Sequence, residues 1–130
     1  MMTFVLRTER IKVRPNFTLM QLARQSKNLY NYGNYIIKRQ LKYSNYMTSE
    51  YELVKMVRHH PCYTNFIPHS AQQTIKFLSK NWKAYFRAKK EYKKNPSKFF
   101  APPKPPGYKK KQGFHTIYLT ADQVHLKEEG

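Results

Sequence analysis

The segment at residues 96–113, PSKFFAPPKPPGYKKKQG, most constrains the fold, because it holds five of the eight prolines of the chain. Proline lacks a backbone N–H and has a fixed φ angle, so this segment can neither continue a helix nor lie inside a sheet. We expect it to be extended and partly polyproline-like. It divides a chain of 130 residues, a length suited to one domain, into a long first part and a short second part.

Two long patterns with helical periodicity precede the prolines. Apolar and small residues recur at steps of three and four over residues 19–41 and again over residues 69–94. Thr18 and Ser49, each followed three residues later by Gln or Glu, predict capped helix starts, the second of a short helix between the long ones. Gly33 lies on the apolar side of the first pattern, where a missing side chain lets another helix approach closely.

Both ends of the chain have β-strand character. Residues 4–13, FVLRTERIKV, are rich in β-branched and apolar side chains, and residues 114–119 and 124–127 predict a C-terminal hairpin. Because an isolated hairpin is marginal in water, we expect the two ends to pair. The sequence therefore predicts an α+β fold, in which a small β-sheet or partial barrel from the N-terminal strand and C-terminal hairpin carries an inserted bundle of about three helices. The expected division is a strand at 1–16, a helical insert at 17–96, a basic proline-rich linker at 97–113 and a return to the sheet at 114–130.

The charge balance indicates a polyanionic partner. The chain has 25 Lys and Arg against 7 Asp and Glu, a formal net charge of +18, and such a chain repels itself unless a partner supplies negative charge. Nucleic acid is the commonest such partner and an anionic membrane the second. Disorder is disfavoured, because 40% of the residues are hydrophobic and 15% are aromatic.

Much of this positive charge lies in one stretch. Residues 76–111 carry 13 Lys and Arg but one Glu, with aromatic residues interleaved. Lysines neutralise phosphates, and aromatic rings stack on unpaired bases at about 1–3 kcal/mol each. Trp82, Tyr85 and Phe86 are better placed in the helical core. The predicted phosphate contacts are Lys76, Lys80, Lys83, Arg87 and Lys90 on the third helix, and Lys104, Tyr108, Lys109, Lys110 and Lys111 in the proline-rich segment.

The sequence gives little support for an enzyme active site or a metal site. Asp122 is the only aspartate, and Glu50 and Glu52 would point apart on a helix, so clustered carboxylates for two metal ions are lacking. One group of residues has side chains of the type that bind zinc and lies close together in the sequence, namely His59, His60, Cys62 and His69. Its spacing matches no common zinc pattern, so we prefer loop histidines that are solvated or touch phosphate. A Cys62 nucleophile is a further alternative. We expect no enzyme activity, no cofactor and no metal.

Three stretches, in order, resemble a known family: NLYNYGNYIIKRQL at 28–41, AQQTIKFLSKNWKAYFRAKK at 71–90 and PPGYKKKQGFHTIYL at 105–119. Together they are similar to the N-terminal part of the TnpB family, transposon-encoded RNA-guided DNA nucleases related to type V CRISPR effectors. This region is often labelled a helix-turn-helix domain of transposases. The resemblance implies a wedge-like barrel and a helical recognition domain that grip the guide RNA and the duplex beside the target.

The resemblance also implies roles for particular residues. Asn31 would match a structural asparagine, and Gln72 and Gln73 would match a polar pair opening the helix that faces DNA. Residues 108–111 would match a basic strip of the family, without its second proline and its Phe. The RuvC-like nuclease domain and the zinc ribbon of the family have no counterpart in this chain, so we expect it to cut nothing.

The expected function is a nucleic-acid-binding module of a TnpB-like RNA-guided nuclease or a transposase-associated protein. Its expected partners are guide RNA, duplex DNA and a separate nuclease domain or full-length nuclease. The alternatives are a stand-alone basic RNA-binding protein of ribosomal type and a regulator of a full-length nuclease, with membrane association a distant fourth. No apolar run approaches the ~20 residues that span a bilayer, and a single cysteine fits a reducing compartment, so we expect a cytoplasmic location.

Overall fold

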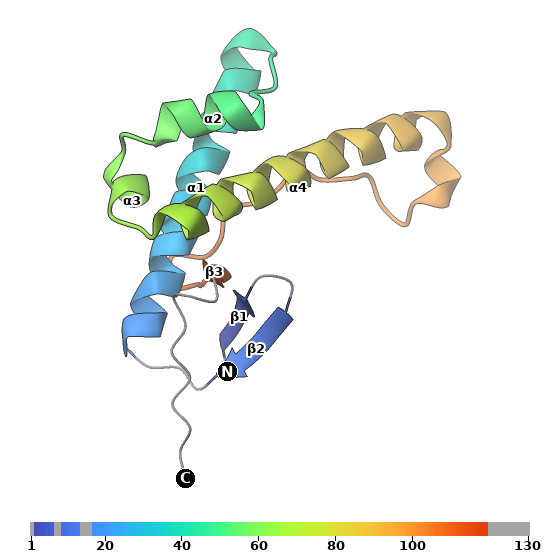
Figure 1. Cartoon of the computed structure of the whole chain (residues 1–130). Helices are drawn as coiled ribbons and strands as arrows, with labels where there is room; N and C mark the ends of the chain where they lie inside the picture. Colours follow the sequence, from blue (N-terminus) through green and yellow to red (C-terminus); the bar gives the residue numbers. More distant parts are fainter. Residues whose placement is uncertain (1, 7–8, 14–16, 120–130) are drawn as a thin grey trace.

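The computed structural model of the chain describes residues 2–6, 9–13 and 17–119, with side chains over residues 17–118. The described chain has two long helices and two short ones. Figure 1 shows that the long helices cross, that the short ones lie beside them, and that a small group of strands lies near one end of the first helix. The elements in chain order are strands β1 (Met2–Leu6) and β2 (Glu9–Val13), helices α1 (Phe17–Ser44), α2 (Glu50–Val57), α3 (Pro61–Thr64) and α4 (Pro68–Lys94), the 3-10 turn η1 (Pro96–Lys98) and strand β3 (Ile117–Leu119).

The hydrophobic core lies where α1, α2 and α4 meet. Helical periodicity turns one face of each helix inward, and the buried faces supply leucines, isoleucines and aromatic rings. The buried residues of this core are Leu29, Tyr30, Ile37, Leu53, Val57, Phe66, Ala71, Ile75, Leu78 and Trp82. The helices therefore bury their apolar faces against one another.

Gly33 lies at the crossing of the two long helices, as its position on the apolar side predicts. A Cβ atom at Gly33 would lie 2.7 Å from Leu78 Cδ2 and 3.2 Å from Ile75 Cδ1. Because such distances are shorter than van der Waals contact, a side chain at position 33 would force Leu78 and Ile75 to shift within the core. The prediction of a close helix approach is confirmed.

The predicted helix ends are partly confirmed. Helix α4 and its stop at Asn95 agree with the pattern, and Ser49 caps α2 by accepting a hydrogen bond from the Glu52 N–H at 3.2 Å. The cap at Thr18 is wrong, because α1 already begins at Phe17. The short helix α3 was not predicted. It begins at a proline, and the His60 side chain caps it.

The predicted α+β fold is wrong, because the described chain is mostly helical and its core is made by helices. Three short strands, in the order β2-β1-β3, form only a small sheet at the edge of the helices, and no barrel is formed by the described residues. The N-terminal segment forms two antiparallel strands where one was expected, so each supplies backbone partners for the other. Strand β3 pairs with β1 in parallel, and the second strand of the predicted C-terminal hairpin lies outside the described residues.

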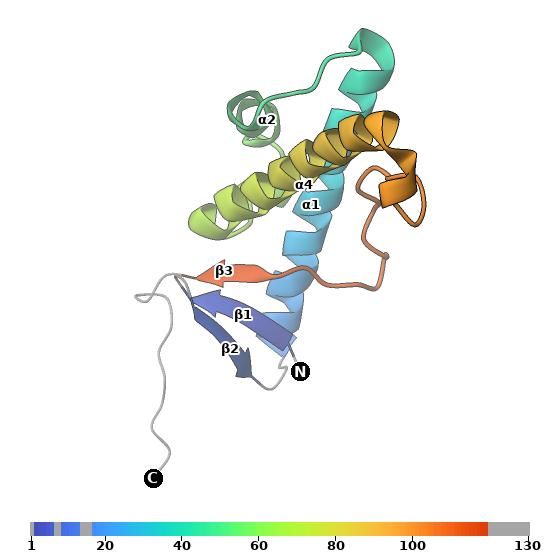
Figure 2. The same ribbon diagram turned by 90° about the vertical axis from the view of Figure 1, so that its right-hand side faces the viewer.

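Strand β3 lies beside α1 (Figure 2), and polar contacts hold it against the helices. Ser26 Oγ of α1 donates to the Thr116 carbonyl at 2.8 Å, and the Tyr118 N–H donates to Ser70 Oγ of α4 at 3.0 Å. The Ile117 side chain is buried against Ala23. The chain that follows the prolines is thus attached to the start of both long helices.

Candidate nucleic-acid interface

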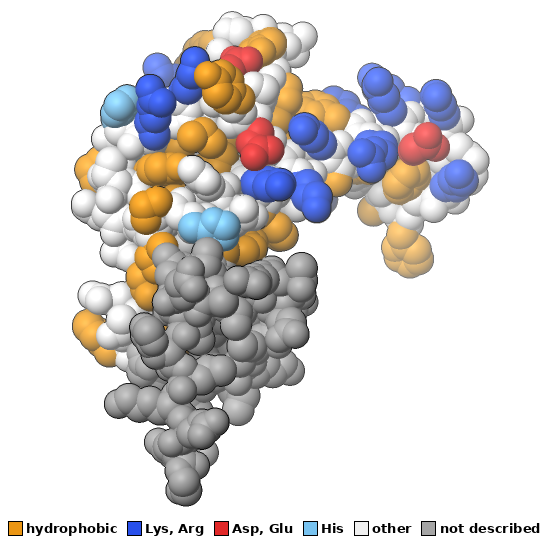
Figure 3. Space-filling model, in the orientation of Figure 1, with side chains coloured by type: hydrophobic (Ala, Val, Ile, Leu, Met, Phe, Trp, Pro, Cys, Tyr) orange, Lys and Arg blue, Asp and Glu red, His pale blue; other side chains and the backbone are white. Residues whose placement is uncertain are grey.

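Helix α4 presents its predicted basic residues to solvent along one stripe. Its inward face carries buried residues such as Ala71, Ile75, Leu78 and Trp82. Gln72 is exposed and Gln73 is half-buried at the start of the helix. The exposed basic residues of the stripe are Lys76, Lys80, Lys83, Arg87 and Lys90, which recur at steps of three and four and therefore share one helix face. Figure 3 shows Lys and Arg side chains gathered over α4.

The second half of α4 extends beyond the helical core. Trp82 is the last buried residue of this helix. Beyond it, Phe86 packs on Trp82 with ring centroids 5.9 Å apart, and Tyr92 meets Phe99 edge-on at 5.7 Å, close to the end of the helix. Figure 1 shows this half projecting away from α1. The projecting half gives the basic side chains access to a large partner from several directions.

Few carboxylates are available to neutralise this charge. Glu91 is the one acidic residue of α4, against eight lysines and arginines in the same helix. Glu50 and Glu52 lie on α2, where Glu52 Oε1 accepts a hydrogen bond from Tyr46 Oη at 2.6 Å. That hydrogen bond and the carboxylate charge raise the pKa of Tyr46. The basic stripe on α4 is therefore largely uncompensated by the described acidic residues.

The proline-rich residues 101–116, which we call the strap, return along α1 (Figure 2), where polar side chains bind their backbone. Asn31 makes two bonds to one strap residue, because Nδ2 donates to the Lys109 carbonyl at 3.0 Å and Oδ1 accepts from the Lys109 N–H at 2.8 Å. Lys27 Nζ donates to the Lys111 carbonyl at 2.7 Å. Side chains of α1 thus satisfy an extended backbone that has few partners of its own.

Asn34 connects the strap to both long helices. Its side chain is fully buried, Nδ2 donates to the Pro106 carbonyl at 3.1 Å, and Oδ1 accepts from Trp82 Nε1 at 2.8 Å. The backbone of the strap therefore lies on α1, and this leaves the side chains of the strap as the groups that can face a partner.

The strap side chains are largely accessible. Lys104, Tyr108, Lys110 and Lys111 are exposed. Lys109 is half-buried, with Nζ 5.0 Å from the centroid of the Tyr30 ring, which is a cation–π contact. Four of the five predicted contact residues of the strap are therefore exposed to solvent.

The structure does not unite the α4 stripe and the strap on one face. Asn81, Ala84 and Ala88 of α4 line a hollow together with Lys104 and Lys109 of the strap. Asn81, Ala84 and Ala88 lie about 80–140° around the helix from the middle of the stripe, because each residue turns a helix by about 100°. The predicted residues thus form two basic surfaces on neighbouring faces of α4.

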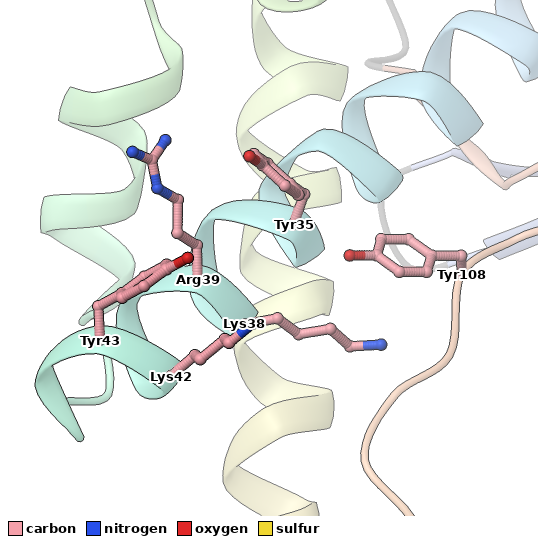
Figure 4. A pocket seen from close by; sticks show the side chains of 6 residues that line it. All are labelled: Tyr35, Lys38, Arg39, Lys42, Tyr43 and Tyr108. Carbon is pink, nitrogen blue, oxygen red and sulfur yellow. The ribbon is translucent and has the colours of Figure 1, made fainter.

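A third basic surface, on α1, was not predicted. Figure 4 shows Tyr35, Lys38, Arg39, Lys42 and Tyr43 of α1 around a hollow that Tyr108 of the strap completes. The volume of this hollow is about 440 Å³. Its sequence signal is the spacing of basic and aromatic residues at steps of three and four over residues 35–43, on the face opposite the apolar pattern. Tyr108 is far from these residues in the sequence, so only the tertiary structure shows that it lines the same hollow.

The histidine and cysteine loop has a structural role. The His60 ring stacks on Tyr32 with centroids 4.0 Å apart, and His60 Nδ1 accepts from the Cys62 N–H at 3.2 Å. His59 and His69 are exposed. Among the described residues, no three His, Cys, Asp or Glu side chains gather in a way that could hold a metal ion. Burial raises the pKa of the Cys62 thiol to about 11, which leaves little of the thiolate that a nucleophile needs.

His115, near the end of the strap, is buried. Its backbone N–H donates to the Ala23 carbonyl at 3.1 Å, and its ring lies 5.0 Å from that of Tyr30 and 5.1 Å from that of Phe77. Burial, together with the nearby charge of Lys109, lowers the pKa of His115 to about 4. This histidine is therefore neutral at physiological pH and supports the strap as part of an aromatic cluster.

No family model, curated protein or solved structure matches this chain. Within the part of the chain that the structure describes, no helix has the length and apolar character needed to cross a membrane. Function is therefore inferred from the arrangement of the residues.

Proposed function

We propose that this chain is a nucleic-acid-binding module that contacts phosphates through the α4 stripe and the exposed lysines of the strap. The observation that carries the proposal is the α4 stripe itself, five exposed cations on one face of a helix with one carboxylate. A helix rises about 1.5 Å per residue, so the stripe from Lys76 to Lys90 is about 21 Å long. Phosphates of one DNA strand are about 3.4 Å apart along the axis, so the stripe spans about six of them.

The order of the three stretches at 28–41, 71–90 and 105–119 favours a more specific form of the proposal. In this form the module belongs to a TnpB-like RNA-guided nuclease or a transposase-associated protein, and its partners are guide RNA, duplex DNA and a nuclease domain. Gln72 and Gln73 at the start of α4 are then candidates for contacts to base edges in the major groove. The chain itself would bind without cutting.

Binding of the full chain to an RNA hairpin and to a duplex DNA should be measured by fluorescence anisotropy between 50 and 200 mM salt. Contact with at least ~5 phosphates predicts a slope of log K against log salt of about −4.5 or steeper on duplex DNA. Direct competition between the hairpin and the duplex then compares the two partners. A preference for structured RNA with no duplex binding would favour a ribosomal-type RNA-binding protein over the nuclease-associated module.

The α4 stripe can be tested with a matched pair of variants. K83Q/R87Q removes two cations from the stripe, and K55Q/R58Q removes one lysine and one arginine from the α2 region. We expect only K83Q/R87Q to weaken binding on all sequences and to reduce the salt slope by about 1.8, since each phosphate contact contributes about 0.9. A slope near zero for the wild-type chain, or equal losses in the two variants, would contradict the proposal.

A further inference from the structure

The groove on α1 combines cations and aromatic rings on one helix face. Tyr35, Lys38, Arg39, Lys42 and Tyr43 follow one another at steps of one to four residues over about two helical turns, and Figure 4 shows the side chains of Tyr35, Arg39 and Tyr43 in a row. Tyr35 is 48% exposed and Tyr43 is 74% exposed. Exposed rings that lie next to one another and next to cations can serve as contact residues for a flat, charged ligand.

The strap supplies the opposite wall of the groove. Tyr108 is 52% exposed and is held in place because Asn31 binds both backbone groups of Lys109, the next residue. Lys38 Nζ of α1 lies 4.2 Å from the centroid of the Tyr108 ring, which joins the two walls by a cation–π contact. The fold thus sets the position of Tyr108 beside α1.

The lining of the groove has a consistent chemistry. All six lining residues are tyrosines, lysines or an arginine. The volume of about 440 Å³ lies within the range of small-molecule sites. Cations suit phosphate groups, and exposed tyrosine rings suit the flat faces of bases. Such a groove fits a phosphate and its attached base better than a phosphate alone.

We infer that the groove formed by α1 and Tyr108 binds unpaired nucleotides of RNA or DNA, with bases stacked on the tyrosines and phosphates held by Lys38, Arg39 and Lys42. Bases within a duplex already stack on each other and cannot offer their faces to a side chain, so the ligand is single-stranded. The inference rests on the proposed function and adds to it. The α4 stripe contacts only phosphates, whereas the groove also contacts bases. The module would then hold a junction, with a paired segment on α4 and an unpaired segment on α1.

The inference can be tested with labelled twelve-nucleotide oligouridylate and oligothymidylate, and with a blunt duplex of twenty base pairs. We expect Y35A/Y108A to bind one or both single-stranded oligomers at least about tenfold more weakly, since each lost stacking contact has an effect of that order. Duplex binding should change less than twofold. Y35F/Y108F, which keeps both rings, should bind like the wild-type chain.

Tyr51 offers a matched control. It is 70% exposed on α2, and Lys55 Nζ lies 4.5 Å from its ring centroid, so it pairs a tyrosine with a lysine as the groove does. It lies beside Glu50, which makes its surroundings unsuitable for phosphate. Y51A should therefore leave the binding of single-stranded oligomers unchanged.

A second measurement does not depend on how the alanine variants fold. Oligouridylate carrying 5-iodouridine should photo-crosslink in the wild-type chain to Tyr35, Tyr43 or Tyr108, as located by mass spectrometry. Crosslinks confined to α4, or Y35A/Y108A binding both oligomers as tightly as the wild-type chain does, would overturn the inference while the proposed function stands. A wild-type chain that binds neither duplex nor oligomer would overturn both.

Discussion

Replacing Asn34 by alanine should release the strap from the helical core and destabilise the protein. The Asn34 side chain is fully buried and makes two hydrogen bonds, one from Trp82 Nε1 at 2.8 Å and one to the Pro106 carbonyl at 3.1 Å. Trp82 is only 2% exposed, so water cannot replace the lost acceptor without opening the core. The substitution therefore affects α1, α4 and the strap together.

The expected loss follows from these two bonds. A buried donor left without a partner costs about 1–3 kcal/mol, and the loss of the bond to Pro106, which water can partly replace, costs about 1 kcal/mol. The higher helix propensity of alanine returns only a few tenths of a kcal/mol. We expect the free energy of unfolding to fall by about 2–4 kcal/mol. With a urea m-value of about 2 kcal/mol/M, the midpoint of unfolding falls by about 1–2 M.

Urea unfolding followed by far-UV circular dichroism and by the fluorescence of Trp82, the only tryptophan, measures this loss. N28A is the control, because Asn28 is exposed on the same helix. This variant has the same change in helix propensity as N34A but loses no buried hydrogen bond. A double-mutant cycle with W82F, followed by circular dichroism alone, should give a coupling energy of at least about 1 kcal/mol. A loss below about 1 kcal/mol in N34A, or strict additivity in the cycle, would refute the reasoning.

Gly33→Val should lower the free energy of unfolding by about 1–3 kcal/mol, because even a Cβ atom would lie 2.7 Å from Leu78 Cδ2 in a filled core. Gly107→Ala is its control and should stay within about 0.5 kcal/mol, since no atom lies within 4 Å of an added Cβ there; equal urea midpoints in the two variants would contradict the packing argument. The pKa of His115 is about 4 in the fold and near 6.5 when unfolded, so the unfolded chain binds more protons between these values. The free energy of unfolding is therefore highest, as far as His115 is concerned, above pH 6.5. It falls by on the order of 3 kcal/mol as the pH is lowered toward 4. His115→Phe should remove this part of the pH dependence of the urea midpoint, and parallel profiles of variant and wild type would show that His115 is not the cause.

The helices were predictable because their signals are local. Apolar residues at steps of three and four predicted both long helices to within a few residues, and Ser49 with Glu52 predicted the cap of α2. Gly33 on an apolar face also predicted the crossing with α4. Each of these signals depends only on neighbours within one or two helical turns, so no knowledge of the fold was needed.

The β-structure was predicted only in part, because strand pairing is not local. The expected pairing of the two chain ends is found between β1 and β3. The pattern over residues 4–13 is the same for one long strand and for two paired strands, and only the pairing of β1 with β2 distinguishes them. The α+β fold was wrong for a related reason. Alternating residues indicate strands but not how much of the core they make, and here the helices bury their apolar faces against one another.

The sequence predicted which basic residues belong to the candidate site but not how they are arranged in space. The basic residues of α4 and the strap were identified from charge alone, and most of them are exposed. The groove on α1 was not identified, because Tyr108 and the α1 residues are about seventy positions apart in the sequence and meet only through Asn31 and Asn34. Charge density is a property of composition, whereas a binding groove needs residues from two segments.

The sequence by itself determined that the chain is cationic, that two long amphipathic helices form, and that the prolines between them and β3 are extended, because charge, periodicity and the proline ring act within short stretches. The tertiary structure decided which surfaces the cations occupy. Buried and half-buried amides of α1 bind the strap backbone, and this places Lys104 and Lys109 of the strap beside a face of α4 that neighbours the stripe. The physical reason is that an unpaired backbone carbonyl must find a donor, and the donors that satisfy the strap lie far from it in the sequence.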